Sequence, residues 1–137
     1  MTIDKLTFQK ESNDFVAYFS IADNQHSMTL CDFSEKQEAQ AEVLANKILK
    51  WLETNLDKSK LFAATELIEL KNETWLEEDE EPINESKFVG MIKFSDVTAF
   101  ADGNFEIYFD DSDIFWGHLI RVDVDEDFKF NSADIAG

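Results

Sequence analysis

Two runs of alternating apolar residues, joined by an acidic corner, dominate the C-terminal half of the sequence. Phe105, Ile107 and Phe109 share one side of the first run. In the second run, the residues that share one side are Ile114, Trp116, His118, Ile120, Val122 and Val124. Aromatic and β-branched residues that recur at period 2 are typical of half-buried strands. The stretch therefore predicts two paired strands, the second beginning at Ile114, with a turn at Asp111–Asp113.

The N-terminal part of the chain has the same period. Apolar residues alternate over residues 6–8, 15–21 and 26–30, and short polar segments separate these runs. The pattern predicts a three-stranded antiparallel meander. His26 lies at a strand entrance beside a turn, where a surface or edge histidine is expected rather than a ligand.

Helical periodicity follows the meander. Ser34 and Gln37 have the spacing of a capping box, which predicts the start of a helix. One apolar stripe consists of Leu44, Ile48, Trp51, Leu52 and Leu56. The polar segment Asn55–Ser59 is expected to break this helix, and a second helix is expected from Lys60 to Lys71. Its inward-facing residues are expected to be Leu61, Ala64, Leu67, Ile68 and Leu70.

The remaining signals complete a fold class. Asn84 predicts the N-cap of a short helix, and residues 94–100 predict a strand that leads into the tight turn Asp102–Gly103. The tail, residues 131–137, is too short to predict a stable element of its own. Because strand segments are separated from helical segments, we expect a single α+β domain over residues 1–137. Its antiparallel sheet would combine the N-terminal three-stranded meander with C-terminal hairpin strands, and two or three helices would pack on one face.

The charge balance is strongly acidic. Thirty Asp and Glu residues against 12 Lys and Arg give a net charge of −18 and an isoelectric point near 4.2. Residues 71–137 hold 18 of the acidic and 5 of the basic residues, so the C-terminal half carries most of the negative charge and of the electrostatic field that it produces. Such a field repels nucleic acid and anionic membranes and attracts basic proteins. The charge therefore fits either a basic protein as partner or a surface whose charge serves solubility alone. In both cases we expect no direct nucleic-acid binding and no membrane association.

The sequence also bears on the compartment. It contains no run of 18 or more apolar residues, and its first residues form no continuous apolar signal core. Cys31 is the single cysteine and has no partner for an internal disulfide, which fits a reducing compartment. These features favour a cytoplasmic protein, and they leave open whether it is a monomer or a small homo-oligomer.

Three acidic clusters and one tryptophan are candidates for binding a partner. The five consecutive acids at Glu77–Glu81 predict a solvated segment, which could serve as a docking edge for a basic protein. Trp75 is a candidate anchor, because aromatic residues dominate binding hot spots. The simpler interpretation of each cluster is a solvated connection or turn. The full set of candidates is Trp75, Glu77, Glu78, Asp79, Glu80, Glu81, Asp110, Asp111, Asp113, Asp123, Asp125, Glu126 and Asp127.

The acidic turn also concentrates oxygen atoms that a hard cation would accept. Asp110, Asp111 and Asp113, with His118 nearby, are weak candidate ligands for Ca²⁺ or Mg²⁺. An EF-hand loop requires Gly at its sixth position and Glu at its twelfth, and neither is present whether the loop is counted from Asp110 or from Asp111. Carboxylates at turns usually accept hydrogen bonds from nearby amides instead. His118 could serve as a general acid or base, but a hydrogen-bonded structural histidine is the simpler interpretation. Zinc-ligand spacing, a phosphate-binding glycine loop and a marked nucleophile are absent, so no cofactor and no catalytic residue is predicted.

Specific motifs nevertheless link the chain to other sequences. Residues Asp102–His118 combine an Asp-Gly turn, an aromatic strand, an acidic turn and the segment Phe-Trp-Gly-His. Together with Glu69–Glu80 and Ser132–Gly137, this stretch resembles an uncharacterised bacterial family, domain of unknown function 2262. Ser112 departs from the family pattern, which typically has Gly there, and a residue with a Cβ adopts positive φ less readily. The resemblance implies a bacterial cytoplasmic setting and no assigned activity.

Three functions follow as hypotheses. The first is a non-catalytic binding module, such as an immunity or inhibitor protein against a basic, nuclease-type toxin, because an acidic surface can occupy a cleft that attracts phosphate. The second is a metal-dependent or acid/base enzyme centred on Asp110–Asp113 and His118. The third is a housekeeping structural protein without a small-molecule site. No complete catalytic motif is present, so the first hypothesis is favoured over an enzyme.

Overall fold

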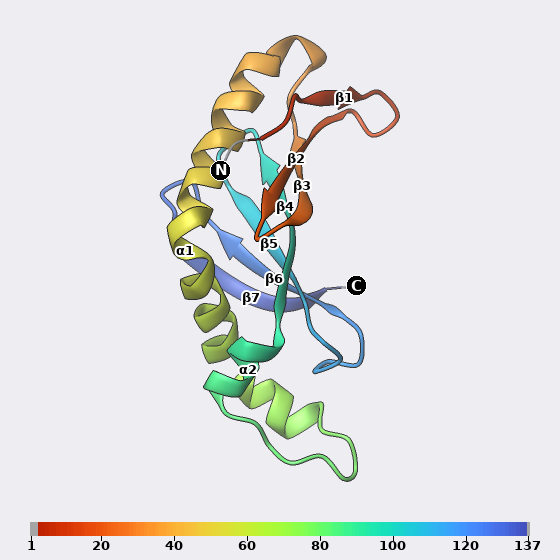
Figure 1. Ribbon diagram of the computed structural model, residues 1–137, viewed down its shortest axis with the longest axis vertical. Coiled ribbons are helices and arrows are strands. Elements are labelled where there is room, and N and C mark those ends of the chain that lie inside the picture. Colours follow the sequence, from red (N-terminus) through yellow and green to blue (C-terminus); the bar gives the residue numbers. More distant parts are fainter. Residues whose placement is uncertain (1–2, 137) are drawn as a thin grey trace.

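The computed structural model describes residues 3–136, which form one sheet with a long helix across one of its faces (Figure 1). The α+β class is therefore confirmed. Within these residues, seven strands lie side by side in the order of the sequence. The strands are β1 (Thr7–Gln9), β2 (Asp14–Ile21), β3 (Asn24–Cys31), β4 (Lys93–Phe100), β5 (Phe105–Asp110), β6 (Leu119–Val124) and β7 (Phe130–Ala136). The helices are a 3₁₀ turn η1 (Glu35–Gln37), α1 (Glu38–Thr74) and α2 (Glu85–Met91).

The sheet is antiparallel except where β3 meets β4. The predicted meander β1–β2–β3 is confirmed, and strands β4 to β7 also pair antiparallel. The pairing of β3 with β4 is parallel, so the prediction of a fully antiparallel sheet is wrong at this junction. The cause is the connection, because α1 and α2 carry the chain back along the sheet before β4 begins. A helical crossover of this kind joins parallel strands.

The strand that follows β5 is shorter than predicted. It begins at Leu119 and not at Ile114, and residues 111–118 form a loop instead. Buried side chains on the predicted strands include Phe105, Ile107, Phe109, Ile120, Val122 and Val124, as the alternation requires. The loop differs from the prediction because the side chain of Asp111 binds its backbone amides, which are then not free for a partner strand.

The tail also differs from the prediction. Residues 130–136 form β7, which pairs antiparallel with β6 at the edge of the sheet. Ala133 and Ile135 contribute to the apolar face, so this short segment is stabilised by the existing sheet and needs no stability of its own. Gly137 lies outside the described residues.

Residues 38–74 form one continuous helix, so the predicted break at Asn55–Ser59 is wrong. The Asn55 side chain donates a hydrogen bond to the Trp51 carbonyl at 2.8 Å, and the Ser59 hydroxyl donates to the Asn55 carbonyl at 2.8 Å. Both side chains bind carbonyls of the same helix, and neither Gly nor Pro interrupts the segment. Polar residues alone therefore do not end this helix.

The buried stripe in the second half of α1 also differs from the prediction. Leu61 and Leu70 are exposed, although both were expected to face inward. The stripe runs through Ala64, Leu67 and Lys71, which are buried, and it leaves the two leucines on its flanks. Lys71 is thus a charged residue at a core position.

Helix α1 covers only the apolar face of the sheet (Figure 1). Alternation along the strands places Glu106, Tyr108, Arg121 and Asp123 on the opposite face. We call this opposite surface, which no helix within residues 3–136 covers, the open face. In the same part of the chain, no helix is long and apolar enough to cross a membrane.

Candidate functional site

The carboxylate of Asp111 organises the loop between β5 and β6. Asp111 is only 2 % exposed, and its side chain accepts four backbone hydrogen bonds. Oδ1 accepts from the Asp113 amide at 2.9 Å. Oδ2 accepts from the amides of Phe115, Gly117 and His118 at 2.9, 3.2 and 3.1 Å. The loop is therefore wound around one carboxylate, whose lone pairs these donors satisfy without a cation.

This loop presents Trp116 to solvent. The side chain is 54 % exposed, and the backbone φ is 59°. For a bulky residue a positive φ is an outlier, with a cost of about 1–3 kcal/mol. It persists because Asp111 holds the amides of both neighbours, Phe115 and Gly117. The predicted common side of Trp116 with the buried Ile120 is therefore wrong.

Four aromatic rings meet where the end of α1 touches this loop, and we call them the tryptophan corner: Trp75, Phe115, Trp116 and His118. The centroid of the Trp75 ring lies 4.8 Å from that of Trp116, 5.4 Å from His118 and 5.7 Å from Phe115. All three contacts are edge-to-face, an arrangement that adds about 0.5–1.5 kcal/mol per pair. Phe115 is buried, and Trp75 and His118 are half-buried. The structure thus brings together two predicted regions that are distant in the sequence.

An ion pair between the buried Lys71 and the exposed Glu80 holds the acidic loop, Glu77–Glu81, beside the tryptophan corner. Lys71 is 1 % exposed, and its Nζ donates to both carboxylate oxygens of Glu80 at 2.8 and 3.0 Å. The same Nζ donates to the Trp75 carbonyl at 2.7 Å, so one ammonium group ties the loop to the end of the helix. The hydrogen bond from Lys71, followed by one from the Glu77 amide, lowers the pKa of Glu80 below its ordinary value.

Four carboxylates of the acidic loop remain available to a partner. These four exposed residues are Glu77, Glu78, Asp79 and Glu81. Trp75 is half-buried rather than buried, so its candidate role as an anchor is retained together with the more exposed Trp116.

The four weak candidate metal ligands do not assemble into a site. The oxygens of Asp111 face amides, Asp110 accepts from a backbone amide at 2.8 Å, and Asp113 is exposed. His118 donates through Nδ1 to the Phe115 carbonyl at 2.6 Å, which is the structural arrangement expected of a half-buried histidine. Among residues 3–136, no group of three or more His, Cys, Asp and Glu is placed to hold a metal ion.

Ser112 occupies a turn position with positive φ. Its φ is 49°, which is the region that glycine adopts most readily. The Ser112 hydroxyl donates to the Met91 carbonyl at 2.5 Å and so ties this loop to the end of α2. The Ser112 side chain therefore adds a contact at a strained position.

The third acidic cluster lies far from the tryptophan corner. The register of β5 and β6 places residues 123–127 beside Phe105, at the opposite end of these strands from Asp110. Asp125 accepts hydrogen bonds from two backbone amides of its own turn. The candidates that the structure separates from the corner are Asp123, Asp125, Glu126 and Asp127.

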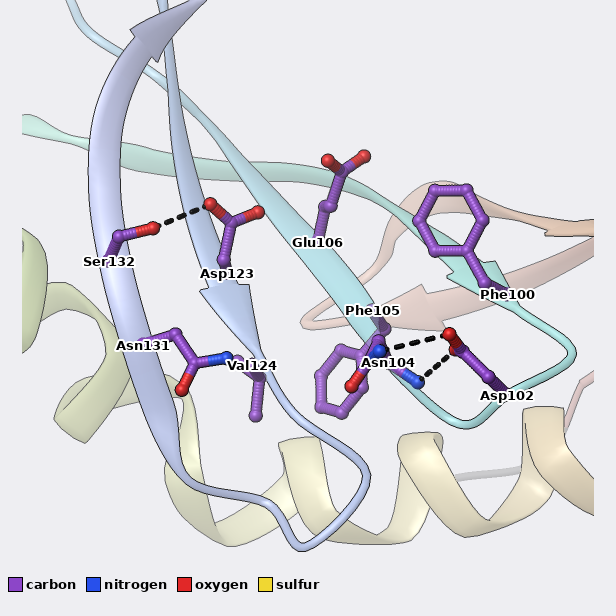
Figure 2. Close-up of a pocket in the computed structure, with 9 residues that line it drawn as sticks. All are labelled: Phe100, Asp102, Asn104, Phe105, Glu106, Asp123, Val124, Asn131 and Ser132. Carbon is purple, nitrogen blue, oxygen red and sulfur yellow. Dashed lines mark hydrogen bonds between the residues drawn. The ribbon is translucent and has the colours of Figure 1, made fainter.

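An acidic groove of about 430 Å³ lies beside that turn, at the edge of the open face (Figure 2). Figure 2 shows Glu106 and Asp123 on neighbouring strands, and Asp102 at the other end of the groove. Each of these carboxylates already has a partner. Arg121 Nε lies 3.8 Å from Glu106 and 3.4 Å from Asp123, while two nitrogens of Asn104 donate to Asp102. The groove is therefore internally paired, and we place the candidate site at the tryptophan corner.

A tyrosine on the open face belongs to the same paired network. The Tyr108 hydroxyl donates to Glu106 at 2.9 Å. Burial, and then this hydrogen bond to a carboxylate, raise the pKa of Tyr108 to about 12. The folded protein therefore keeps the Tyr108 proton to a higher pH than an ordinary tyrosine does.

The comparison with protein families identifies the chain. A family model described as an uncharacterized protein conserved in bacteria, DUF2262, matches residues 1–135. The chain belongs to the DUF2262 family. This confirms the resemblance carried by residues 102–118, and it places the tryptophan corner and the acidic groove inside the DUF2262 match. No curated protein and no solved structure gave a significant match.

Sequence reasoning missed Lys71 and the contact between Trp75 and Trp116. The spacing along the helix indicates the buried position of Lys71. Counted from Ala64, Leu67 lies at i+3 and Lys71 at i+7, so all three share one face of α1. No local pattern indicates the tryptophan contact, since it arises from the path of α1 across the sheet.

Proposed function

We propose that this DUF2262 protein is a non-catalytic binding module that engages a basic protein through the tryptophan corner and the acidic loop. The observation that carries the proposal is Trp116, a large aromatic side chain that is 54 % exposed and held at positive φ by a buried carboxylate. Backbone strain concentrates at functional sites, and Trp is enriched in binding hot spots.

The surroundings of Trp116 favour a cationic group in the partner. A Lys or Arg side chain over the exposed indole face would gain about 0.5–1 kcal/mol, rising to about 2 kcal/mol once water is excluded. Asp113 and the four exposed carboxylates of the acidic loop would add a longer-range attraction. A basic surface could thus meet an aromatic anchor and a negative field at one place.

We further propose that the partner is a basic, nuclease-type toxin and that the chain acts as its inhibitor or immunity protein. The net charge of −18 supports this proposal, because a nuclease cleft must be positive to attract phosphate. The side chains of Asp111 and His118 each bind backbone groups of the loop, so both are used to hold its shape. This supports a binding role over the enzyme hypothesis.

The proposal is tested by affinity purification of the tagged protein from its own cells at low and high salt, followed by mass spectrometry. We expect a basic protein to be recovered in stoichiometric amounts at low salt and depleted at high salt. If that protein is a nuclease, adding the purified chain should suppress cleavage of a nucleic-acid substrate.

Two matched variants make the test specific. Trp116→Ala should reduce recovery of the partner by about tenfold or more, as expected for a hot-spot residue. Leu61→Ala is the control, because Leu61 is a similarly exposed apolar side chain, 51 % against 54 %, on the middle of α1. Equal recovery by wild type and both variants, or the absence of any salt-sensitive partner, would show that the corner is not the binding surface.

A further inference from the structure

A second site lies where strands β3 and β4 separate. Their parallel pairing begins at Met28 and Val97, and before this point the strands leave a cleft of about 670 Å³. Leu56 and Lys60 of α1 border the cleft on the helix side. Its full lining is Ile21, Ala22, Asn24, Gln25, His26, Leu56, Lys60, Lys93, Phe94, Ser95 and Asp110.

The cleft gathers hydrogen-bond donors and positive charge in a chain that is otherwise acidic. Lys60 and Lys93 line it together with the side-chain amides of Asn24 and Gln25. Asp110 is the one carboxylate in the lining, and one of its oxygens accepts a hydrogen bond from a loop amide. Among the lining residues, two ammonium groups and one carboxylate give a charge of +1, whereas the whole chain carries −18.

Within residues 3–136, Lys60 and Lys93 form no ion pair. Asp110 lies opposite Lys93 in the register of β4 and β5 and offsets part of its charge. Lys60 is half-buried, so its ammonium is partly removed from water without gaining a charged partner. An anion in the cleft would supply the missing partner.

His26 adds a third nitrogen whose position is fixed. Its Nδ1 donates to the Ser95 carbonyl at 2.6 Å, and its ring packs 4.6 Å from the Phe94 ring. The residue is half-buried. Nε2 has no hydrogen-bond partner among the described residues and is available to a ligand.

We propose that this cleft binds a small organic anion through a phosphate or carboxylate group. Lys60 and Lys93 would bind the oxyanion, His26 Nε2 and the amides would complete its hydrogen bonds, and Leu56 with Phe94 would contact an apolar body. The distant carboxylates of the chain oppose binding only weakly at physiological salt, where the Debye length is about 8 Å. This site is independent of the tryptophan corner.

The experiment is a titration of the full chain followed by backbone amide chemical shifts at constant ionic strength. The probes are phenyl phosphate, benzoate and the neutral benzyl alcohol. We expect saturable shifts centred on residues 24–26 and 93–95 with at least one of the two anions, and none with benzyl alcohol. If phenyl phosphate saturates at the lower concentration, phosphate is the preferred head group. If benzoate does, carboxylate is preferred.

Charge-matched variants decide the role of the lysines. Lys60→Gln and Lys93→Gln should each weaken binding by about tenfold, the loss expected for one charge-assisted hydrogen bond. Lys58→Gln is the control, because Lys58 is exposed on the same helix, is not part of the cleft lining and changes the net charge equally. The proposal is overturned if neither anion gives saturable shifts, if benzyl alcohol binds equally well, or if all three variants behave alike.

Discussion

Replacing Asp111 by alanine removes the group around which the β5–β6 loop is wound. The Phe115 amide is buried, so the loss of its acceptor costs about 1–3 kcal/mol. The other three amides are partly exposed and can bind water instead, so each loses about 0.5–1 kcal/mol. We therefore expect Asp111→Ala to lower the free energy of unfolding by about 3–5 kcal/mol, a large share of the 5–15 kcal/mol typical of a domain.

Urea unfolding followed by tryptophan fluorescence measures this effect. With a slope of about 1–3 kcal/mol per molar urea, the midpoint should fall by roughly 2 M. The slope itself should change little, because the loop is a small part of the surface exposed on unfolding. The fluorescence of native Asp111→Ala should also change, since Trp116 is no longer held beside Trp75.

Asp113→Asn is the matched control for Asp111→Ala, because Asn tolerates the positive φ of 68° at this position, which Ala adopts less readily. It removes the same charge from the same loop, but Asp113 is exposed and only its backbone amide takes part in the network. Its midpoint should lie within about 0.5 kcal/mol of wild type, as for most surface substitutions. If both variants unfold at the same urea concentration, Asp111 does not organise the loop and the reasoning is refuted.

Three further outcomes are expected from other parts of the fold. Glu80→Ala leaves the buried Lys71 ammonium with the Trp75 carbonyl as its remaining partner and should lower the free energy of unfolding in urea by about 1–3 kcal/mol. Adding Lys71→Met should restore most of this loss, and an unchanged single variant would contradict a stabilising pair of Lys71 with Glu80. For Tyr108, the raised pKa means that the folded state holds the phenol proton between pH 10 and about 12. Stability should therefore fall as pH rises through that window, and phenolate absorbance should show one tyrosine titrating late. Gly103→Ala should lower the melting temperature, at a cost of about 1–3 kcal/mol, because φ is 98° and the added Cβ would lie 2.9 Å from the facing turn; Gly90→Ala, in open space, should not.

The parts of the fold that follow from local periodicity could be predicted from the sequence. The meander, β5 and the cap of α2 by Asn84 were each indicated by alternation or by a capping residue. The Asn84 side chain accepts from the Lys87 amide at 2.8 Å, as such a cap requires. These features depend on neighbours within a few residues, which the sequence displays directly.

The features that could not be predicted depend on partners that are distant in sequence or on side chains that bind the backbone. The parallel pairing of β3 with β4 follows from the helical crossover through α1 and α2. Strand β7 forms because its backbone can pair with the edge of β6. The loop after β5 has the alternation of a strand, but the carboxylate of Asp111 takes up its amides. For the candidate site, the sequence indicated Trp75 and the acidic turn separately, and only the path of α1 brings them together.

The parallel junction has a consequence for the order in which the chain is made. Strand β3 ends at Cys31 and its neighbour β4 begins at Lys93, so a ribosome delivers the whole of α1 before the second half of the sheet exists. Until then β3 presents an unpaired edge, which is a template for intermolecular pairing. Nascent chains that end before Lys93 therefore carry an open strand edge, and α1 can cover the apolar face of the half-built sheet but leaves that edge unpaired.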